Sequence, residues 1–388
     1  MSALAVALLK HGHRVTGADR NLETPNIAFL KSLGIDVFPD DGSGVDRETD
    51  EVIVSTAIEE DNAGLRRARE YGIKITHRAV ALSETLADRN LGAVVGTCGK
   101  STVTAMLGHV LAECGLDPFC VNGANVPGWL GAVRAGAGEY AVAEVDESDK
   151  SLVAFSPYAA VVTNASADHY SEAEMNEVFD AFIKNCPGPV IDARGEVYAP
   201  EEFNEQNASL AIRMAVALGC RKEDAEKAMT TFGGVERRLQ FFGNGVYDDY
   251  AHNPEKLRSM WAALAKRHPG GLCAVWRPHG YAPLRKMKDA LAEMFCEVMR
   301  PQDRLLLLPV YDAGGTTDRT INSDSLLARI FELAPEKAKR VEIVDSLETA
   351  FLRMSEGFDR HEAFVTCGAR DPGLSALARR LAQARGEK

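Results

Sequence analysis

The stretch LGAVVGTCGKST, residues 91–102, decides how this chain is interpreted. Its apolar part, residues 91–95, predicts a buried strand, and the glycine-rich part runs directly into a helix predicted over residues 101–114. Glycines allow backbone amides to turn toward phosphate oxygens, a helix N-terminus adds partial positive charge, and a lysine adds a full charge. The hydroxyl group after the lysine is placed to bind the Mg²⁺ that accompanies ATP. We therefore predict a nucleoside triphosphate site, although Val94 stands where the usual pattern has its first glycine, and an ordinary turn is the alternative.

Two further stretches follow predicted strands in the same way. EVDESD, residues 144–149, closes an apolar strand at residues 140–144, and TNASADH, residues 163–169, follows a strand at residues 159–163. Ligands of open parallel sheets collect where the strands end at their carboxyl edge, and carboxylates there can hold Mg²⁺. The carboxylates of residues 144–149 are therefore candidate metal ligands, and His169 is a candidate for contact with metal or phosphate. The alternatives are a solvated acidic loop and an incidental histidine.

Alternating helix and strand patterns predict an α/β protein with parallel sheets. With 388 residues the chain is long enough for two or three domains. Restarts of the pattern predict three: an incomplete Rossmann-like domain at residues 1–90, a P-loop ATP-binding domain with a mostly parallel sheet at residues 91–235, and a Rossmann-like α/β domain at residues 236–388. The third domain has strands predicted at residues 245–249, 272–276, 304–310, 341–344 and 363–366.

The first domain has predicted helices at residues 4–10 and 26–33, with strands at residues 14–19 and 34–38 and a buried strand at residues 51–55. Its pattern begins at the first helix, so that the expected sheet lacks a central strand and the glycine-rich loop that would follow it. Asp19 closes a strand of this domain. It is a weak candidate for contact with a substrate's ribose or base, and a loop carboxylate is the alternative.

Bulk properties exclude several classes of function. A net charge of −12 argues against unassisted nucleic-acid binding. The eight cysteines lack metal-site spacing and suit reduced thiols, so we expect a cytoplasmic protein. Residues 1–9 have the pattern of a helix face rather than a signal peptide, and no apolar run approaches the length of a membrane span, so no membrane partner is expected.

Taken together, these motifs resemble those of the Mur ligase family. GTCGKST, EVDESD and TNASADH are similar to the motifs of its central ATPase domain, and VSTAI at residues 54–58 to a motif of its first domain. In the last third, the paired Arg237 and Arg238 and the segment DDYAHNP at residues 248–254 also match. The resemblance covers nearly the whole chain in collinear order. Within the family it is strongest to enzymes that join L-alanine to UDP-N-acetylmuramate in peptidoglycan precursor synthesis.

The resemblance implies an ATP-dependent ligase that forms an amide bond through an acyl phosphate, with ATP and Mg²⁺ as cofactors and a UDP-sugar carboxylate and an amino acid as substrates. Lys100, His169 and Arg238 would be catalytic, and Ser101, Glu144 and His169 would hold metal. Tyr311 is a weaker candidate for contact with the amino acid. The implied nucleotide-binding residues are Gly96, Thr97, Cys98, Gly99, Lys100, Ser101, Thr102, Asn204, Asn207, Asp249, His252 and Asn253.

Simpler interpretations stand beside these assignments. Arg237 and Arg238 are surface charges in the alternative view, residues 252–254 are only a turn and a helix start, and no chemistry is assigned to the Cys98 thiol. Gly280 stands where the alanine ligases commonly have arginine. Together with the absent glycine-rich loop of the first domain, this leaves open a Mur-type ligase with another carboxylate or amine, such as a peptide-recycling ligase, a catalytically impaired nucleotide-binding paralogue, or a P-loop kinase.

Overall fold

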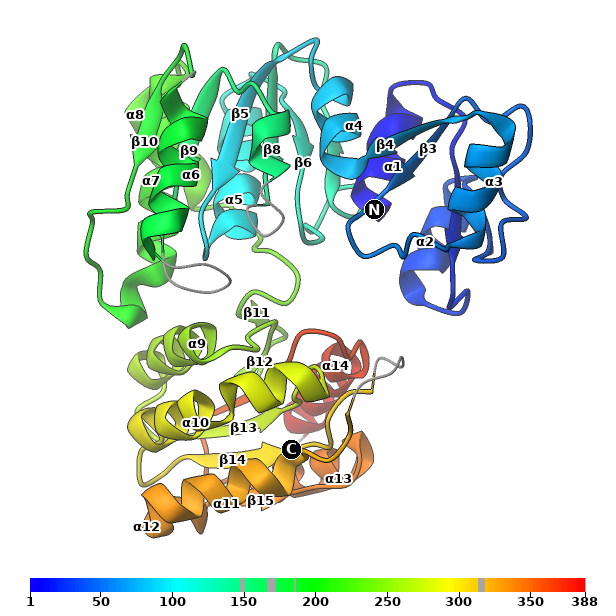
Figure 1. Ribbon diagram of the computed structural model, residues 1–388. Coiled ribbons are helices and arrows are strands. Elements are labelled where there is room, and N and C mark those ends of the chain that lie inside the picture. Colours follow the sequence, from blue (N-terminus) through cyan, green and yellow to red (C-terminus); the bar gives the residue numbers. More distant parts are fainter. Residues whose placement is uncertain (147–150, 166–171, 185, 313–317, 388) are drawn as a thin grey trace. The chain divides into compact units, whose positions relative to one another are not determined.

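The computed structural model describes residues 1–146, 151–165, 172–184, 186–312 and 318–387 (Figure 1). Two compact units make up this structure. The first comprises Met1–Glu196 and Asn207–Gly234, and the second comprises Val197–Gln206 and Val235–Lys388. Each unit contains a six-stranded sheet whose strands are mostly parallel, which confirms the predicted α/β class. The predicted division of the chain at residues 90 and 235 stays a prediction.

The first 90 residues form two separate two-stranded parallel sheets, β1-β2 and β3-β4. The predicted strand at residues 51–55 is present as β3, but the prediction that it is buried is wrong: its residues are half-buried, because β3 is paired on one side only among the described strands. The elements are α1 (Ser2–Lys10), β1 (Thr16–Asp19), α2 (Pro25–Ser32), β2 (Asp36–Pro39), β3 (Glu51–Val54), α3 (Ala63–Tyr71), β4 (Lys74–His77) and α4 (Arg78–Thr85).

Local sequence signals fix several of these helix ends. The Thr24 hydroxyl accepts a hydrogen bond from the Ile27 amide at 3.2 Å, and Pro25 occupies the first position of α2. Gly72 ends α3 in a left-handed conformation, with φ of 68°. Helices α1 and α4 pack against the following part of the first unit. Val6 of α1 and Ala79 of α4 belong to the same hydrophobic cluster as Ala93, a residue of strand β5 (Asn90–Val95).

The large sheet of the first unit has the order β10-β9-β5-β8-β6-β7, with only the edge strand β7 antiparallel to its neighbour. Its buried residues alternate between two hydrophobic clusters, so the sheet is covered on both faces. Helix α6 lies on the face that α1 and α4 share, and α5, α7 and α8 cover the other. The elements are β5 (Asn90–Val95), α5 (Lys100–Glu113), β6 (Phe119–Val121), β7 (Val133–Ala135), β8 (Tyr140–Glu144), η1 (Ser151–Ala154), β9 (Ala159–Val162), α6 (Glu172–Lys184), β10 (Val190–Asp192), α7 (Phe203–Ala217) and α8 (Lys222–Met229).

The sheet of the second unit has the order β11-β12-β16-β13-β14-β15, with only the short β11 antiparallel. Helices α9, α10 and α11 pack on one face, and α13 and α14 pack on the other (Figure 1). The elements are η2 (Pro200–Glu202), β11 (Gln240–Phe241), β12 (Val246–Asp249), α9 (Pro254–Arg267), β13 (Leu272–Trp276), α10 (Tyr281–Val298), β14 (Arg304–Leu307), α11 (Ser323–Leu333), α12 (Pro335–Ala338), β15 (Val341–Ile343), α13 (Leu347–Ser355), β16 (Ala363–Cys367) and α14 (Gly373–Gly386).

All five strands predicted for the last third are present, and β14 is shorter than predicted because it ends at Leu307. In the part of the chain that the structure describes, no helix has the length and apolarity needed to cross a bilayer.

Candidate functional site

The glycine loop lies where β5 ends, at the carboxyl edge of the sheet of the first unit. Gly96 and Gly99 have φ angles of 128° and 85°, values that residues with a Cβ rarely adopt. A Cβ on Gly96 would overlap the Thr163 hydroxyl, so this position has no room for a side chain. The loop then enters α5 at Lys100, as its sequence predicts.

Two residues that follow β9 clamp this loop. The Asn164 side chain accepts hydrogen bonds from the Cys98 amide at 2.9 Å and the Thr97 hydroxyl at 2.7 Å. In return, Cys98 O accepts bonds from the Thr163 hydroxyl at 2.6 Å and from Asn164 Nδ2 at 3.1 Å. The backbone of Cys98 is therefore held on both sides, and its buried thiol is a small side chain in a tight loop. The sequence did not predict this clamp, because it depends on the pairing of β5 with β9, which no local pattern marks.

The charged and hydroxyl side chains of the loop belong to the first turn of α5. Lys100 reaches back over the loop, where its ammonium group donates to Gly96 O at 2.7 Å. Ser101 is buried beside it, and Thr102 is half-buried. A lysine, a helix N-terminus and glycines that leave the backbone accessible are the parts from which phosphate-binding loops are built.

Glu144 ends β8, the strand next to β5, and pairs in register with Val94 just before the loop. Its Oε2 accepts a hydrogen bond from the Gly123 amide at 2.8 Å, and a side chain on Gly123 would overlap the carboxylate. Oxygen ligands such as Ser101 and Glu144 suit Mg²⁺, which takes few ligands from the protein and completes its shell with phosphates and water. Within the described ranges, no three His, Cys, Asp or Glu side chains gather as a metal site. The third predicted ligand, His169, lies outside the described residues.

A cavity of about 410 Å³ opens beside Glu144 in the first unit. It is lined by α1 and α4, by the loop after β6 and by the end of β8. Arg78 of α4 lies in this lining and forms an ion pair with Asp146 at 3.0 Å. The cavity thus places both signs of charge next to a predicted metal ligand.

Asn204 and Asn207 lie one turn apart on α7, which puts their side chains on the same face of the helix. Asn207 is 1% exposed, and its Nδ2 has no acceptor among the described residues. A buried donor without a partner is costly, so it fits a hydrogen bond supplied by a ligand. This observation agrees with the predicted contact to adenine.

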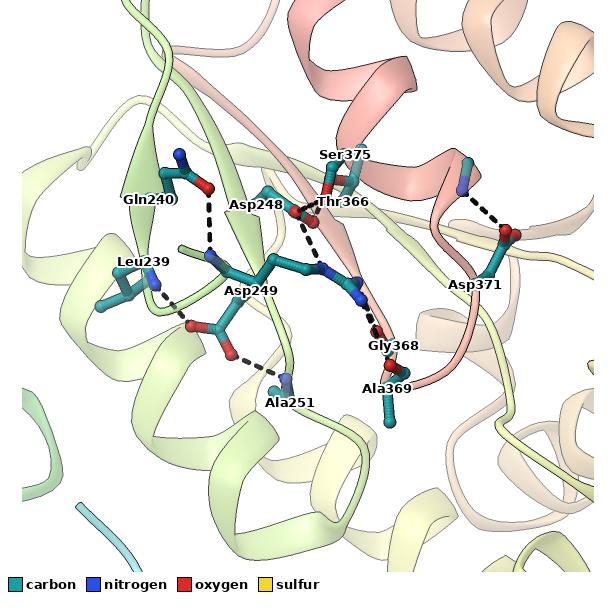
Figure 2. A network of polar contacts seen from close by, with 12 residues as sticks. Leu239, Gln240, Asp248, Asp249, Ala251, Thr366, Gly368, Ala369, Asp371 and Ser375 are labelled. Atoms are coloured by element: carbon teal, nitrogen blue, oxygen red, sulfur yellow. Dashed lines mark hydrogen bonds and ion pairs between the residues drawn. The ribbon is translucent and has the colours of Figure 1, made fainter. Parts of the chain in front are cut away.

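The two aspartates that end β12 anchor the turn that carries the paired arginines in the second unit (Figure 2). Asp248 is fully buried and accepts hydrogen bonds from Arg237 Nε at 3.0 Å, from the Thr366 hydroxyl at 2.8 Å and from the Ser375 hydroxyl. The Arg237 side chain also donates to backbone carbonyls after β16 and is only 17% exposed. Arg237 is therefore not an ordinary surface charge.

Asp249, the second aspartate, is held by backbone amides. Its carboxylate oxygens accept from the Leu239 amide and the Ala251 amide, each at 2.7 Å (Figure 2). Burial raises the pKa of Asp249 from 3.8 to about 6, against the opposing effects of Arg238 and the two amides. The Arg238 guanidinium also lies 5.1 Å from the centre of the Tyr250 ring. Contact of Asp249 with a ribose stays a prediction.

The candidates His252, Asn253 and Tyr311 lie in loops at the carboxyl edge of the sheet of the second unit, after β12 and β14. The His252 ring centre lies 4.7 Å from that of His279, which follows β13. The Tyr311 amide, after β14, donates to Pro278 O at 2.8 Å. Asn253 has a structural role, since its side chain accepts from the Lys256 amide at 3.0 Å and caps α9, as the helix-start alternative predicted.

The weak candidate Asp19 is exposed at the end of β1 and accepts a hydrogen bond from the Asn21 amide at 2.9 Å. This is the geometry of a loop carboxylate. Its predicted contact with a substrate stays untested.

The first unit thus has the fold and loop of an α/β protein of the phosphate-binding-loop class. Family models described as "Mur ligase family, catalytic domain", "Mur ligase middle domain" and "Mur ligase, glutamate ligase domain" match residues 1–90, 94–184 and 237–370. The UDP-N-acetylmuramate–L-alanine ligase of Agrobacterium fabrum is 30% identical, over 85% of this chain and 84% of that protein. The chain belongs to the Mur ligase family and is therefore a ligase.

Two further comparisons extend over the full chain. The protein named UDP-N-acetylmuramate–L-alanine ligase of Rhizobium meliloti is 29% identical over 100% of this chain and 96% of its own length. The crystal structure of the UDP-N-acetylmuramate–alanine ligase of Thermotoga maritima has a TM-score of 0.80, with 24% identity over 100% of this chain and 96% of that one. The latter similarity confirms the fold.

Proposed function

We propose that this ligase uses ATP to join L-alanine to the carboxylate of UDP-N-acetylmuramate, a cytoplasmic step of peptidoglycan precursor synthesis. The relatives that span the chain carry the name of this activity. The observation that carries the proposal is the pairing of β5 with β8. It puts Lys100 and the glycine loop on the same sheet edge as Glu144.

The chemistry requires stabilisation of a transferring phosphoryl group. The substrate carboxylate attacks the γ-phosphate of ATP, which yields an acyl phosphate and ADP, and the amine then displaces phosphate to form the amide. Lys100 and the amides of residues 99–102 would bind the triphosphate, and Arg238 would stabilise the charge that develops during transfer. Mg²⁺ would neutralise phosphate charge when held by Ser101, Glu144 and His169.

The resemblance also implies further contacts to the nucleotide and to the two substrates. Asn204 and the unpaired Nδ2 of Asn207 would bind adenine. Asp249 would meet the ribose, and His252 and Asn253 would line the nucleotide. Tyr311 would lie near the amino acid, and Asp19 near the UDP-sugar. We keep residues 1–90, 91–235 and 236–388 as the proposed domains.

The direct test is product analysis. The protein is incubated with ATP, Mg²⁺, UDP-N-acetylmuramate and each of the common amino acids, and ADP, phosphate and the nucleotide product are measured by mass spectrometry. We expect ADP, phosphate and UDP-N-acetylmuramoyl-L-alanine in equal amounts, with phosphate release that needs both cosubstrates. ATP binding without acid-dependent phosphate release would identify an impaired paralogue, and a product with a peptide or another amine would identify a different Mur-type ligase.

A further inference from the structure

Arg370, at the carboxyl edge of the sheet of the second unit, lies close to Gly280, the glycine that stands where the family pattern has an arginine. Gly280 follows β13, and Arg370 follows β16. These strands are neighbours, with Trp276 paired in register with Cys367, so both loops leave the same edge of the sheet. A Cβ built on Gly280 would lie 3.9 Å from Arg370 Nη1. The guanidinium of Arg370 therefore extends toward the space that a side chain at position 280 would enter.

The neighbouring Arg277 has a different role, because its guanidinium is committed. It forms an ion pair with Asp371, and its Nε donates to Pro309 O at 3.1 Å. Arg370, in contrast, is exposed and makes no hydrogen bond or ion pair with any residue that the structure describes. A guanidinium fork without a protein partner is suited to bind a carboxylate through two parallel hydrogen bonds.

The surroundings of Gly280 are those of a ligand site rather than of a plain surface. His279, the residue before it, lies against the ring of His252 from the loop after β12. Tyr311 is tied to the same loop through Pro278 O. Ligands of open α/β sheets bind at this carboxyl edge. An amino acid, the proposed second substrate, brings a carboxylate that keeps its negative charge throughout the reaction.

We propose that Arg370 binds the carboxylate of the amino-acid substrate and thereby replaces, from a different strand, the arginine that the resemblance leads us to expect at position 280. This inference rests on the proposed function and adds a specificity-determining residue to it. The backbone of Gly280, with φ of 162°, is extended, so an arginine is compatible with this position. The nearest atoms to its Cβ belong to Pro283, at 3.3 Å and 3.6 Å, and to the flexible end of Arg370.

The test measures KM for L-alanine and for ATP in four proteins: the unsubstituted chain, Arg370→Ala, the double variant Arg370→Ala with Gly280→Arg, and Arg360→Ala. Arg360 is an exposed arginine before the amino end of β16, on the opposite edge of the same sheet, and is the matched control. Because Arg370 has no partner to lose among the described residues, thermal denaturation of Arg370→Ala should match that of the unsubstituted chain.

We expect Arg370→Ala to raise KM for L-alanine about tenfold or more, the loss that removal of a charge-assisted hydrogen bond produces, with KM for ATP unchanged. The double variant should recover most of the loss, and Arg360→Ala should have no effect. L-Alaninamide, which lacks the carboxylate, should be used equally poorly with and without Arg370.

Three results would overturn the inference: an unchanged KM for L-alanine in Arg370→Ala, an equal rise in KM for ATP, or an undiminished effect of Arg370→Ala on L-alaninamide. A double variant that recovers nothing would overturn the shared role of positions 280 and 370. If the unsubstituted chain releases no acid-dependent phosphate with any amino acid, the proposed function itself is wrong and the inference fails with it.

Discussion

Among the segments that hold their backbone in the left-handed region, the loop after β5 and the turn before β11 do so by different means. The loop after β5 uses glycines, Gly96 and Gly99, with φ angles of 128° and 85°. The turn before β11 uses Arg237 and Leu239, with φ angles of 58° and 44°. Such angles cost residues with a Cβ about 1–3 kcal/mol each and persist only where the surroundings enforce them.

The difference has a physical reason. A loop that brings its backbone amides to a phosphate must stay free of side chains, so glycine serves both conformation and access. The turn carries residues with side chains at these positions, and its backbone is held from outside by the buried Asp248 and Asp249. In the proposed function this turn presents Arg238. Substitutions of the loop glycines and of the buried aspartates therefore test what stabilises the backbone of each segment.

The largest loss of stability is expected from Asp248→Ala. Removing this carboxylate leaves the half-buried Arg237 without its anionic partner, which should lower the free energy of unfolding of the second unit by about 3–5 kcal/mol. Urea denaturation followed by tryptophan fluorescence measures it, because Trp261 and Trp276 are buried in the core of that unit.

The control for this experiment is Asp324→Ala. Asp324 is an exposed aspartate in the first turn of α11, so its loss should cost less than about 1 kcal/mol. Equal losses in the two variants would mean that Asp248 does not hold the turn.

A second prediction concerns the pH dependence of stability. Burial raises the pKa of Asp249 from 3.8 to about 6. Between these two pH values the Asp249 carboxyl group therefore binds its proton more tightly in the folded state than in the unfolded state. Its contribution to stability is therefore full below the ordinary pKa and is lost as the pH rises through about 6. A shift of about two pKa units corresponds to roughly 3 kcal/mol.

Comparison with Asp249→Asn isolates this contribution, because the amide does not titrate. The difference in free energy of unfolding between the two proteins should move by roughly 2 kcal/mol between pH 4 and pH 7, in favour of the unsubstituted chain at pH 4, because the unfolded aspartate is already partly ionised at pH 4. Urea denaturation at both pH values measures it. A difference that stays constant across this range would show that Asp249 keeps an ordinary pKa.

A smaller effect is expected from Gly96→Ala in the loop. The added methyl group would overlap the Thr163 hydroxyl at a positive φ, which should lower the free energy of unfolding by about 1–3 kcal/mol and weaken stabilisation by ATP and Mg²⁺. Thermal denaturation with and without the nucleotide measures both effects. Gly195→Ala is the matched control, since no atom lies within 4 Å of its Cβ position. Similar behaviour of the two variants would contradict a sterically restricted loop.

The difference between the loop and the turn also explains why the loop could be predicted from the sequence. The conformation of the loop depends on its own residues and their immediate neighbours, so the sequence predicts a loop at residues 96–99 together with the strand and the helix on either side of it. The role of its residues in binding a nucleotide stays a prediction. The cap at Asn253 was open to the same local reasoning.

The conformation of the turn before β11 could not be predicted from neighbouring residues. Asp248 finds two of its partners, Thr366 and Ser375, more than 100 positions further along the chain. No local pattern marks Arg237 and Leu239 as left-handed. The clamp by Thr163 and Asn164 and the half-buried state of β3 likewise depend on which strands become neighbours, and that pairing is a property of the fold.

The most direct test of the central claim, that the loop after β5 binds the triphosphate for carboxylate activation, is the rate of phosphate release by Lys100→Ala. The assay uses ATP, Mg²⁺, UDP-N-acetylmuramate and L-alanine, with Lys222→Ala, an exposed lysine of the same unit, as control. We predict a fall of about 10³-fold for Lys100→Ala, typical of losing a group that stabilises transition-state charge, and no change for the control. An undiminished rate in Lys100→Ala would contradict the account.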